Sequence, residues 1–387
     1  MPHPPLRADH VGSLLRPPEL LQARVEHKAG RLSAEELRRI EDDAIRDGVR
    51  MQQEIGLEGV TDGEFRRRSW HMDFLYQIGG VAKTDQTLRI QFRNDAGPVE
   101  AALGAFRIGG KLTLDKTIFA EDFAYLKSVA PAGTVAKLTI PSPSMLHYRG
   151  GRAVIDPAVY PEMDAFWHDL AEVYRQQIAG LAALGCTYLQ LDDTSLAYLN
   201  DPAQRAYVTS IGGDGDKQHL TNIRLINQAL ADKPAGMTVC THMCRGNFRS
   251  SWVAEGGYDH VAEALFGELA VDGFFLEYDD ARSGGFAPLR FVPRGSKRVV
   301  LGLVTSKRPA LESKDDLKRR IDEAAKYVPL EQLCLSPQCG FSSTVEGNAL
   351  TIEEEKAKLR LVVETAREVW GVVGTTTTRR KSPGRRR

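Results

Sequence analysis

The sequence predicts an α/β protein built as one (β/α)8 TIM barrel, and two features of the chain lead to this prediction. Short apolar runs rich in β-forming residues alternate with longer stretches of helical periodicity along most of the 387 residues, as the elements of a parallel barrel do. Nearly every short run also ends in polar or reactive residues, and such barrels carry their chemistry at the carboxyl ends of the strands. The length would allow two domains, but no internal repeat is visible, so we favour one decorated barrel over residues 1–374.

Eight runs form the expected barrel strands. They cover residues 10–13, 57–61, 136–140, 187–191, 237–241, 274–278, 299–304 and 333–336. Helices are expected between them. Ser33 and Glu36 have the spacing of a capping box, which opens a helix to about residue 55. Further helical stretches cover residues 162–184, 218–231, 261–269, 314–327 and 351–369.

The segment after the second expected strand is too long for one helical crossover. It runs from residue 62 to residue 133, and residues 88–93 and 104–112 within it alternate in polarity and carry turn residues. We therefore expect an inserted hairpin that shapes the mouth of the barrel.

The charge is balanced but unevenly distributed. Lysine plus arginine and aspartate plus glutamate both number 51, whereas residues 375–387 hold six basic residues and no acid, which leaves 45 basic against 51 acidic residues in the rest. This tail has no apolar residue to bury, so we expect it to be disordered and solvated. A polyanion-binding arm is the alternative. The mildly acidic body argues against nucleic acid as the main ligand.

Composition also bears on the compartment. No run of 18 apolar residues could span a membrane, and the N-terminus lacks the apolar core of a signal peptide, so we expect a cytoplasmic protein. Five cysteines are too few for a disulfide framework in a chain of this length. We interpret Cys186, Cys240 and Cys334 as small core residues.

The other two cysteines are candidate metal ligands. His242 and Cys244 lie two residues apart on an extended segment, so their side chains point to the same side. Zinc accepts imidazole, thiolate and carboxylate ligands, and Glu277 and Cys339 would supply a third and a fourth ligand from other strand ends. A histidine and a cysteine at this spacing alone can equally be structural or incidental.

Six short motifs then resemble one known family. They are His10-Val-Gly-Ser13, Thr61-Asp-Gly-Glu64, Gln190-Leu-Asp192, His242-Met-Cys244, Phe275-Leu-Glu277 and Pro337-Gln-Cys339-Gly340. Together, and in this order, they resemble the catalytic barrel of the cobalamin-independent methionine synthases. The resemblance runs from about residue 10 to residue 370 and is closest to the short members with a single barrel.

The resemblance implies roles for these residues. His242, Cys244, Glu277 and Cys339 match the zinc ligands of the family. Gly12 and Ser13 match the positions that hold the amino-acid thiol, and Glu64 and Asp192 match the two acids that bind its amino group. The implied activity is zinc-dependent transfer of a methyl group to homocysteine or a similar small thiol, in methionine synthesis.

The chain departs from the family at one position. Full-length synthases carry a histidine after the seventh strand, thought to protonate the leaving folate nitrogen, whereas residues 305–308 here read Thr-Ser-Lys-Arg. The methyl donor is therefore open, and His71 and His147, expected in mouth loops, are the remaining candidate acids. The sequence does not indicate the oligomeric state.

Elementary chemistry points to the same reaction class. Two thiolates and a carboxylate would make an electron-rich shell that keeps a substrate thiolate nucleophilic, so we expect alkyl transfer to sulfur. One alternative is a thiol alkyltransferase with a different thiol and a non-folate electrophile, like epoxyalkane:coenzyme M transferase. Another is a binding protein with a closed structural zinc site and a basic tail.

Overall fold

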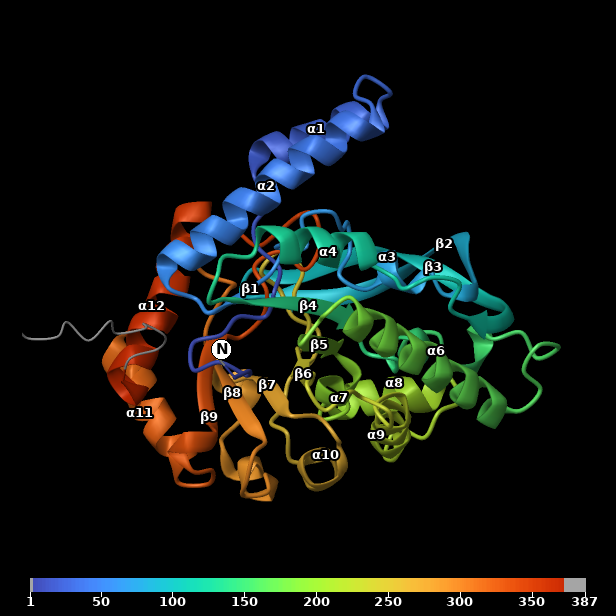
Figure 1. The fold of residues 1–387 in the computed structure, drawn as a ribbon. Coiled ribbons are helices and arrows are strands. Elements are labelled where there is room, and N and C mark those ends of the chain that lie inside the picture. Colours follow the sequence, from blue (N-terminus) through green and yellow to red (C-terminus); the bar gives the residue numbers. More distant parts are fainter. Residues whose placement is uncertain (1–2, 372–387) are drawn as a thin grey trace, which may run out of the picture.

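The computed structural model describes residues 3–371, and a curved sheet of seven parallel strands forms its centre (Figure 1). The strands pair in the order β1-β4-β5-β6-β7-β8-β9. Their bounds are β1 Gly59–Val60, β4 Val135–Pro141, β5 Tyr188–Asp193, β6 Thr238–Met243, β7 Gly273–Glu277, β8 Arg298–Val304 and β9 Leu333–Pro337. Each overlaps one of the expected runs, from the second to the eighth. Most of their residues are buried, as in a barrel covered by helices.

The first expected strand, residues 10–13, is wrong as a regular strand. The N-terminal segment instead makes a single parallel bridge from Ala8 to Leu335 of β9. On its other side, Leu14 N donates to Gly63 O at 3.1 Å. Gly12 explains the interruption, because its φ of +138° departs from strand geometry and a Cβ there would lie 2.7 Å from a methyl group of Thr139. The segment therefore takes the eighth position between the edges of the sheet, and the predicted barrel class is confirmed with one irregular member.

Helices cover the outside of the sheet (Figure 1). The longer ones are α1 Pro18–Lys28, α2 Ala34–Ile55, α4 Ala120–Val129, α6 Met163–Ala183, α8 Pro202–Ser210, α9 Gln218–Ala229, α10 Ala262–Glu268, α11 Lys314–Ala325 and α12 Ile352–Trp370. The short ones are α3 Met72–Leu75, α5 Met145–Tyr148 and α7 Ser195–Tyr198. The expected capping box opens α2, with the Ser33 side chain accepting from Glu36 N. Figure 1 shows α1 and α2 projecting from the body as a helical hairpin.

The inserted hairpin is confirmed and is longer than predicted. It consists of β2 Gly79–Asn94 and β3 Gly97–Thr113, which pair antiparallel. Arg93 near its tip exchanges two backbone hydrogen bonds with Trp252, at 2.8 and 2.9 Å. This contact fixes the hairpin to the loop after β6, which brings Ile90 and Phe92 to the cavity described below.

The barrel interior holds a buried ion pair. Lys137 Nζ lies 3.2 Å from Asp9 Oδ1, both side chains are 0% exposed, and the Tyr188 hydroxyl donates to Asp9 at 2.7 Å. The interpretation of Cys240 and Cys334 as core residues is confirmed, since both are fully buried. Cys186 is buried as well, and all five cysteines are free.

Two expectations concern the ends of the chain and its relation to membranes. The tail predicted over residues 375–387 lies outside the described residues. Within residues 3–371, no helix has both the length and the apolar character needed to cross a bilayer.

Candidate metal centre and active site

Six of the eight expected site residues line one cavity at the carboxyl ends of the strands. They are Ser13, Glu64, Asp192, His242, Cys244 and Cys339. The strand register explains the convergence, because Asp192 in β5 and His242 in β6 are directly paired across neighbouring strands. The parallel order thus gathers residues far apart in the sequence at one end of the barrel.

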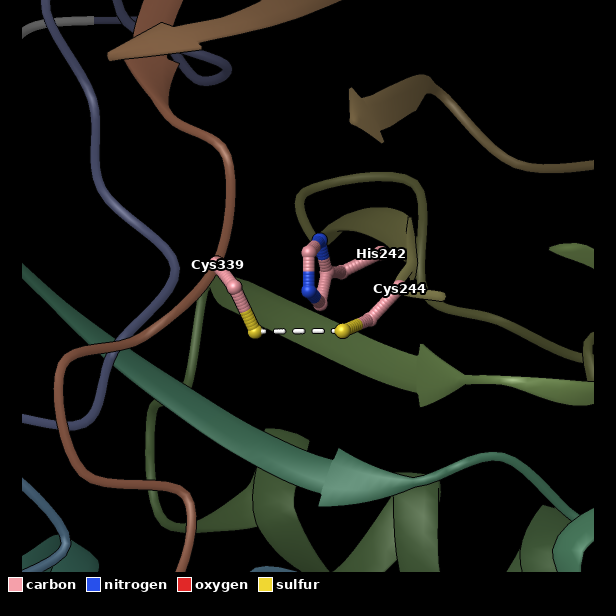
Figure 2. Close-up of side chains that lie close together, drawn as sticks. All are labelled: His242, Cys244 and Cys339. Atoms are coloured by element: carbon pink, nitrogen blue, oxygen red, sulfur yellow. Dashed lines mark hydrogen bonds between the residues drawn. The ribbon is translucent and has the colours of Figure 1, made fainter. Parts of the chain in front are cut away.

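The three candidate ligands His242, Cys244 and Cys339 lie together. Figure 2 shows His242 and Cys244 projecting from one strand end toward Cys339 on the opposite loop. A ligand atom from each lies within 4.8 Å of the others, and the two sulfurs are 3.3 Å apart. That separation is too long for a disulfide bond and suits two ligands of one ion.

The imidazole of His242 supports the same interpretation. Both its ring nitrogens are buried and have no hydrogen-bond partner within residues 3–371. A buried polar atom without a partner is costly, and a metal would satisfy one of these nitrogens. Imidazole with two thiols is a donor set that zinc prefers, so the residues fit this ion.

The two thiols are electrostatically unequal. The hydrogen bond with Cys244 holds the pKa of Cys339 well below its ordinary value, aided by His242. The same hydrogen bond, together with burial, raises the pKa of Cys244 well above its ordinary value. The pair therefore shares a proton, and a divalent cation would displace it.

Glu277, the fourth expected ligand, is not brought into this group. Its carboxylate is fully buried, and Oε2 accepts a hydrogen bond of 2.9 Å from the backbone N–H of Arg245. Oε1 lies 3.4 Å from Arg282 and 3.5 Å from Lys307. Burial raises the pKa of Glu277, but the positive charges of Lys307, Arg245 and Arg282 outweigh burial and hold this pKa below its ordinary value. Glu277 is thus an ionised neighbour of the ligands, and its coordination of the metal stays a prediction.

Glu64 and Asp192 form an acidic part of the cavity. Glu64 Oε1 accepts a hydrogen bond of 2.8 Å from Thr139, while Oε2 has no partner within the described residues although it is buried. Burial, with a contribution from Glu64, raises the pKa of Asp192 to about 7. Burial also raises the pKa of Glu64. Arg67, whose Nη1 lies 3.6 Å from Glu64 Oε1, is the cation already present beside this acid. The unpartnered Oε2 of Glu64 and the carboxyl group of Asp192 are the groups that a cationic ligand in the cavity could engage.

The neighbouring Asp193 has a different role. Its carboxylate accepts hydrogen bonds from the Ser144 and Ser195 hydroxyls and from the Leu196 N–H. Its oxygens are therefore engaged in holding the start of α7. Asp192 is left as the acid that can accept from a ligand, as the resemblance implied.

Gly12 and Ser13 lie beside the acids. A Cβ on Gly12 would lie at ordinary contact distance, 3.7 Å, from Glu64 Oε1, which places the glycine directly beside this carboxylate. Ser13 O accepts from Phe341 N at 3.0 Å, which joins the N-terminal segment to the loop that carries Cys339. Gly12 thus lies beside Glu64, and Ser13 lies beside the loop that carries Cys339.

The remaining cavity wall is mainly apolar and aromatic, with one cation. It includes Trp70, Phe92, Met145, Tyr198 and Phe248, and the cation is Arg149. The periodicity of the sequence did not identify these residues as site residues, because they come from the inserted hairpin, from irregular loops and from the short helices α5 and α7. The alternation within residues 88–93 was the one available signal.

The two candidate proton donors, His71 and His147, differ in their position relative to the cavity. His71 lines the cavity, and burial lowers its pKa to about 3. His147 does not line it, and packs instead against Trp167 with ring centroids 4.6 Å apart. His147 does follow the carboxyl end of β4, as expected for a mouth segment, but its ring packs against Trp167 of α6, so the expectation that it could act as an acid in the cavity is wrong.

Comparison with known proteins decides the family. The model of the cobalamin-independent synthase catalytic domain matches residues 7–368. The chain belongs to the cobalamin-independent methionine synthase family. This confirms the resemblance, and it makes the protein a methyltransferase enzyme of that family.

Individual relatives agree with this family. The uncharacterised protein YxjH of Bacillus subtilis is 48% identical over 366 residues, which cover 95% of each chain. A methionine synthase of Pyrococcus horikoshii is 24% identical over 342 residues and 87% of each chain. A solved structure from Listeria monocytogenes, assigned as a vitamin-B12-independent methionine synthase, is 41% identical, with a TM-score of 0.77 over 95% of this chain and 99% of the other.

Proposed function

We propose that this methyltransferase uses zinc to transfer a methyl group to the thiol of homocysteine or a closely similar amino-acid thiol. The observation that carries the proposal is the adjacency of two groups in one cavity. His242, Cys244 and Cys339 offer a thiolate-rich metal site, and Glu64 and Asp192 offer paired acids. A small thiol that also carries an ammonium group satisfies both.

Each group has a separate task in the reaction. Zinc, when bound by the histidine and the cysteines, supplies a positive charge that keeps the acceptor sulfur deprotonated at neutral pH. Glu64 and Asp192 bind the ammonium and fix the orientation of the acceptor. The apolar wall excludes water from the sulfur and the methyl carbon. The new S–CH₃ bond then forms as the bond from the methyl group to the donor breaks, and the electron pair leaves with the donor.

The leaving group sets the expected donor. A folate nitrogen leaves poorly without a proton, and general acid catalysis is worth roughly 10²–10⁴-fold. Residues 305–308 hold no histidine, and His71, with a pKa of about 3, is neutral at physiological pH. We therefore expect weak activity with methyl-folate and better activity with a donor whose leaving group needs no proton, such as methylcobalamin or a sulfonium.

The alternatives are less compatible with the cavity. An acceptor with an anionic head, such as coenzyme M, could pair with Arg149 but would meet the two acids Glu64 and Asp192 in the same cavity. A purely structural zinc site is normally closed, whereas all three candidate ligands line a cavity.

Methionine formation tests the proposal directly. The zinc-loaded protein is incubated with homocysteine and each donor in turn, and methionine is quantified. Cys339→Ser should abolish turnover, while Cys334→Ser, a matched change at a buried cysteine of β9 away from the cavity, should retain it. Absence of methionine with every donor, or equal turnover in both variants, would contradict the proposal.

A further inference from the structure

Lys307 is a buried cation beside the metal centre that the reaction described above does not use. It follows β8 in the stretch where full-length synthases carry a histidine, and it is 5% exposed. Its Nζ lies 3.5 Å from Glu277 Oε1 and has no hydrogen-bond partner within residues 3–371. A buried ammonium without hydrogen bonds is costly, so its retention calls for a charge that it compensates.

The backbone around Lys307 is tied to the loop that carries Cys339. The amide and hydroxyl of Ser306 both donate to Gln338 Oε1 at 2.8 Å, and the hydroxyl also lies 3.0 Å from Gly340 O. Asn348 donates to Ser306 O at 2.8 Å. The turn that presents the ammonium is therefore fixed relative to a metal ligand.

Glu277 connects the ammonium to the other cysteine. Its Oε2 accepts from the N–H of Arg245, the residue that follows Cys244. The second cation near Glu277, Arg282, is already engaged by Asp280 at 2.7 Å and by Asp279 at 3.5 Å. Within residues 3–371, Glu277 is the one carboxylate in ion-pair contact with Lys307, and the next negative charge that acts on its ammonium is that of Asp279.

The net charge of the metal centre changes when the acceptor binds and when it is methylated, and Lys307 lies close enough to Glu277 to offset this change. A divalent ion with two cysteine thiolates is neutral, and the Glu277 carboxylate adds one negative charge. An acceptor thiolate adds a second negative charge in the same buried volume, whereas a thioether product adds none. Buried anions are stabilised strongly by a fixed opposite charge nearby.

We propose that Lys307 is a positioning residue that holds Glu277 and supplies the counter-charge for the acceptor thiolate, so that the site binds anionic sulfur in preference to the neutral thioether. This inference rests on the proposed function. It gives Lys307 a role in exchanging product for acceptor, because methylation removes the negative charge that the ammonium compensates.

The test compares two ligands that differ in the charge of their sulfur. Homocysteine and methionine are titrated calorimetrically into zinc-loaded wild type, Lys307→Met and Lys307→Arg at about pH 8. In Lys307→Met the preference for homocysteine over methionine should fall at least about tenfold, with methionine affinity nearly unchanged. Lys307→Arg should keep the preference within about threefold, since it keeps the charge.

A matched control comes from the other end of β8. Lys297 precedes this strand and donates to Leu269 O, so Lys297→Met removes an equivalent ammonium away from the metal centre and should leave the preference intact. Zinc content and thermal unfolding are measured for each variant. Lys307→Gln serves as a second neutral variant should Lys307→Met not fold.

The outcomes separate the two claims. A wild type that binds homocysteine no better than methionine contradicts the proposed function itself. A wild type with a clear preference that Lys307→Met or Lys307→Gln retains overturns only the role of Lys307. An equal loss in Lys307→Arg also overturns it, because the effect would then not follow the charge.

Discussion

The paired acids Glu64 and Asp192 predict a pH dependence of ligand binding that a single substitution should remove. An ammonium ligand binds best when both carboxylates are ionised, and burial raises the pKa of Asp192 in the metal-free protein, which is used for this test, to about 7. Below that pH the pair holds a proton that the ligand must displace. Affinity should therefore be complete above pH 7 and fall as the pH is lowered through it.

The magnitude follows from the pKa of Asp192. The apparent Kd should increase by a factor of about 11 at pH 6 and by about 1.1 at pH 8 relative to the fully ionised site. Methionine is the suitable probe, because it carries the ammonium group but no thiol that would titrate. Proton release on binding should be about 0.9 at pH 6 and about 0.1 at pH 8, measurable by calorimetry in buffers of different ionisation enthalpy.

Asp192→Asn should flatten this profile. At pH 8 the variant should bind methionine roughly 10- to 100-fold more weakly than wild type, because it loses one hydrogen bond to a charged group. The affinity of the variant should change little between pH 6 and pH 8. Glu255→Gln is the control, because Glu255 pairs with Arg93 at the exposed hairpin contact. A wild-type affinity that changes less than about twofold over this range, or an unaltered slope in Asp192→Asn, would contradict a role for Asp192 in binding the ammonium.

Three further predictions concern the metal and the stability of the fold. Cys339→Ser should lose most of its zinc by metal analysis, while Cys334→Ser should retain it; full zinc in the former means that the ligands are misassigned. Lys137→Met leaves the buried Asp9 carboxylate unpaired and should lower the free energy of unfolding by about 3–5 kcal/mol in denaturant titrations, with partial recovery in the double variant Lys137→Met/Asp9→Asn; an unchanged midpoint would contradict this. Burial raises the pKa of Glu355 to about 8, so the folded state binds the extra proton, and stability should decline as the pH rises from about 4.5 to 8. Glu355→Gln should remove up to about 4 kcal/mol of that decline, and a parallel pH profile in wild type and variant would argue against it.

The order of the barrel strands could be predicted because each is an apolar run closed by polar residues. Residues 274–278 and 299–304, for example, overlap β7 and β8 closely. The first strand could not be predicted, because its extended character is interrupted at Gly12 by a close approach to Thr139. Such an approach depends on tertiary packing and leaves no periodic signal in the sequence.

Some residues of the candidate site could be predicted from the sequence, and others depend on tertiary packing. His242, Cys244 and Cys339 could be predicted, because their residue types point to metal binding and the barrel brings strand ends together. Asp192 could be chosen over Asp193 only through the family motif, since the two differ in the hydrogen bonds they accept. The position of His147 was beyond sequence reasoning, because it depends on which way the short helix α5 turns.

The apolar wall of the cavity also could not be predicted from the sequence. Phe92 belongs to an inserted hairpin whose tip is fixed by two backbone hydrogen bonds to Trp252. Backbone pairing between segments so far apart has no counterpart in local composition, so the sequence indicates the hairpin but not what it covers.

We propose that a zinc ion held by His242, Cys244 and Cys339 receives the sulfur of the acceptor. Zinc X-ray absorption with and without homocysteine measures this step. We expect two sulfur neighbours at about 2.3 Å in the free enzyme and three after homocysteine is added. Methionine, whose sulfur carries no charge, should leave the number at two. A sulfur count that does not change with homocysteine would mean that the acceptor sulfur does not bind the metal.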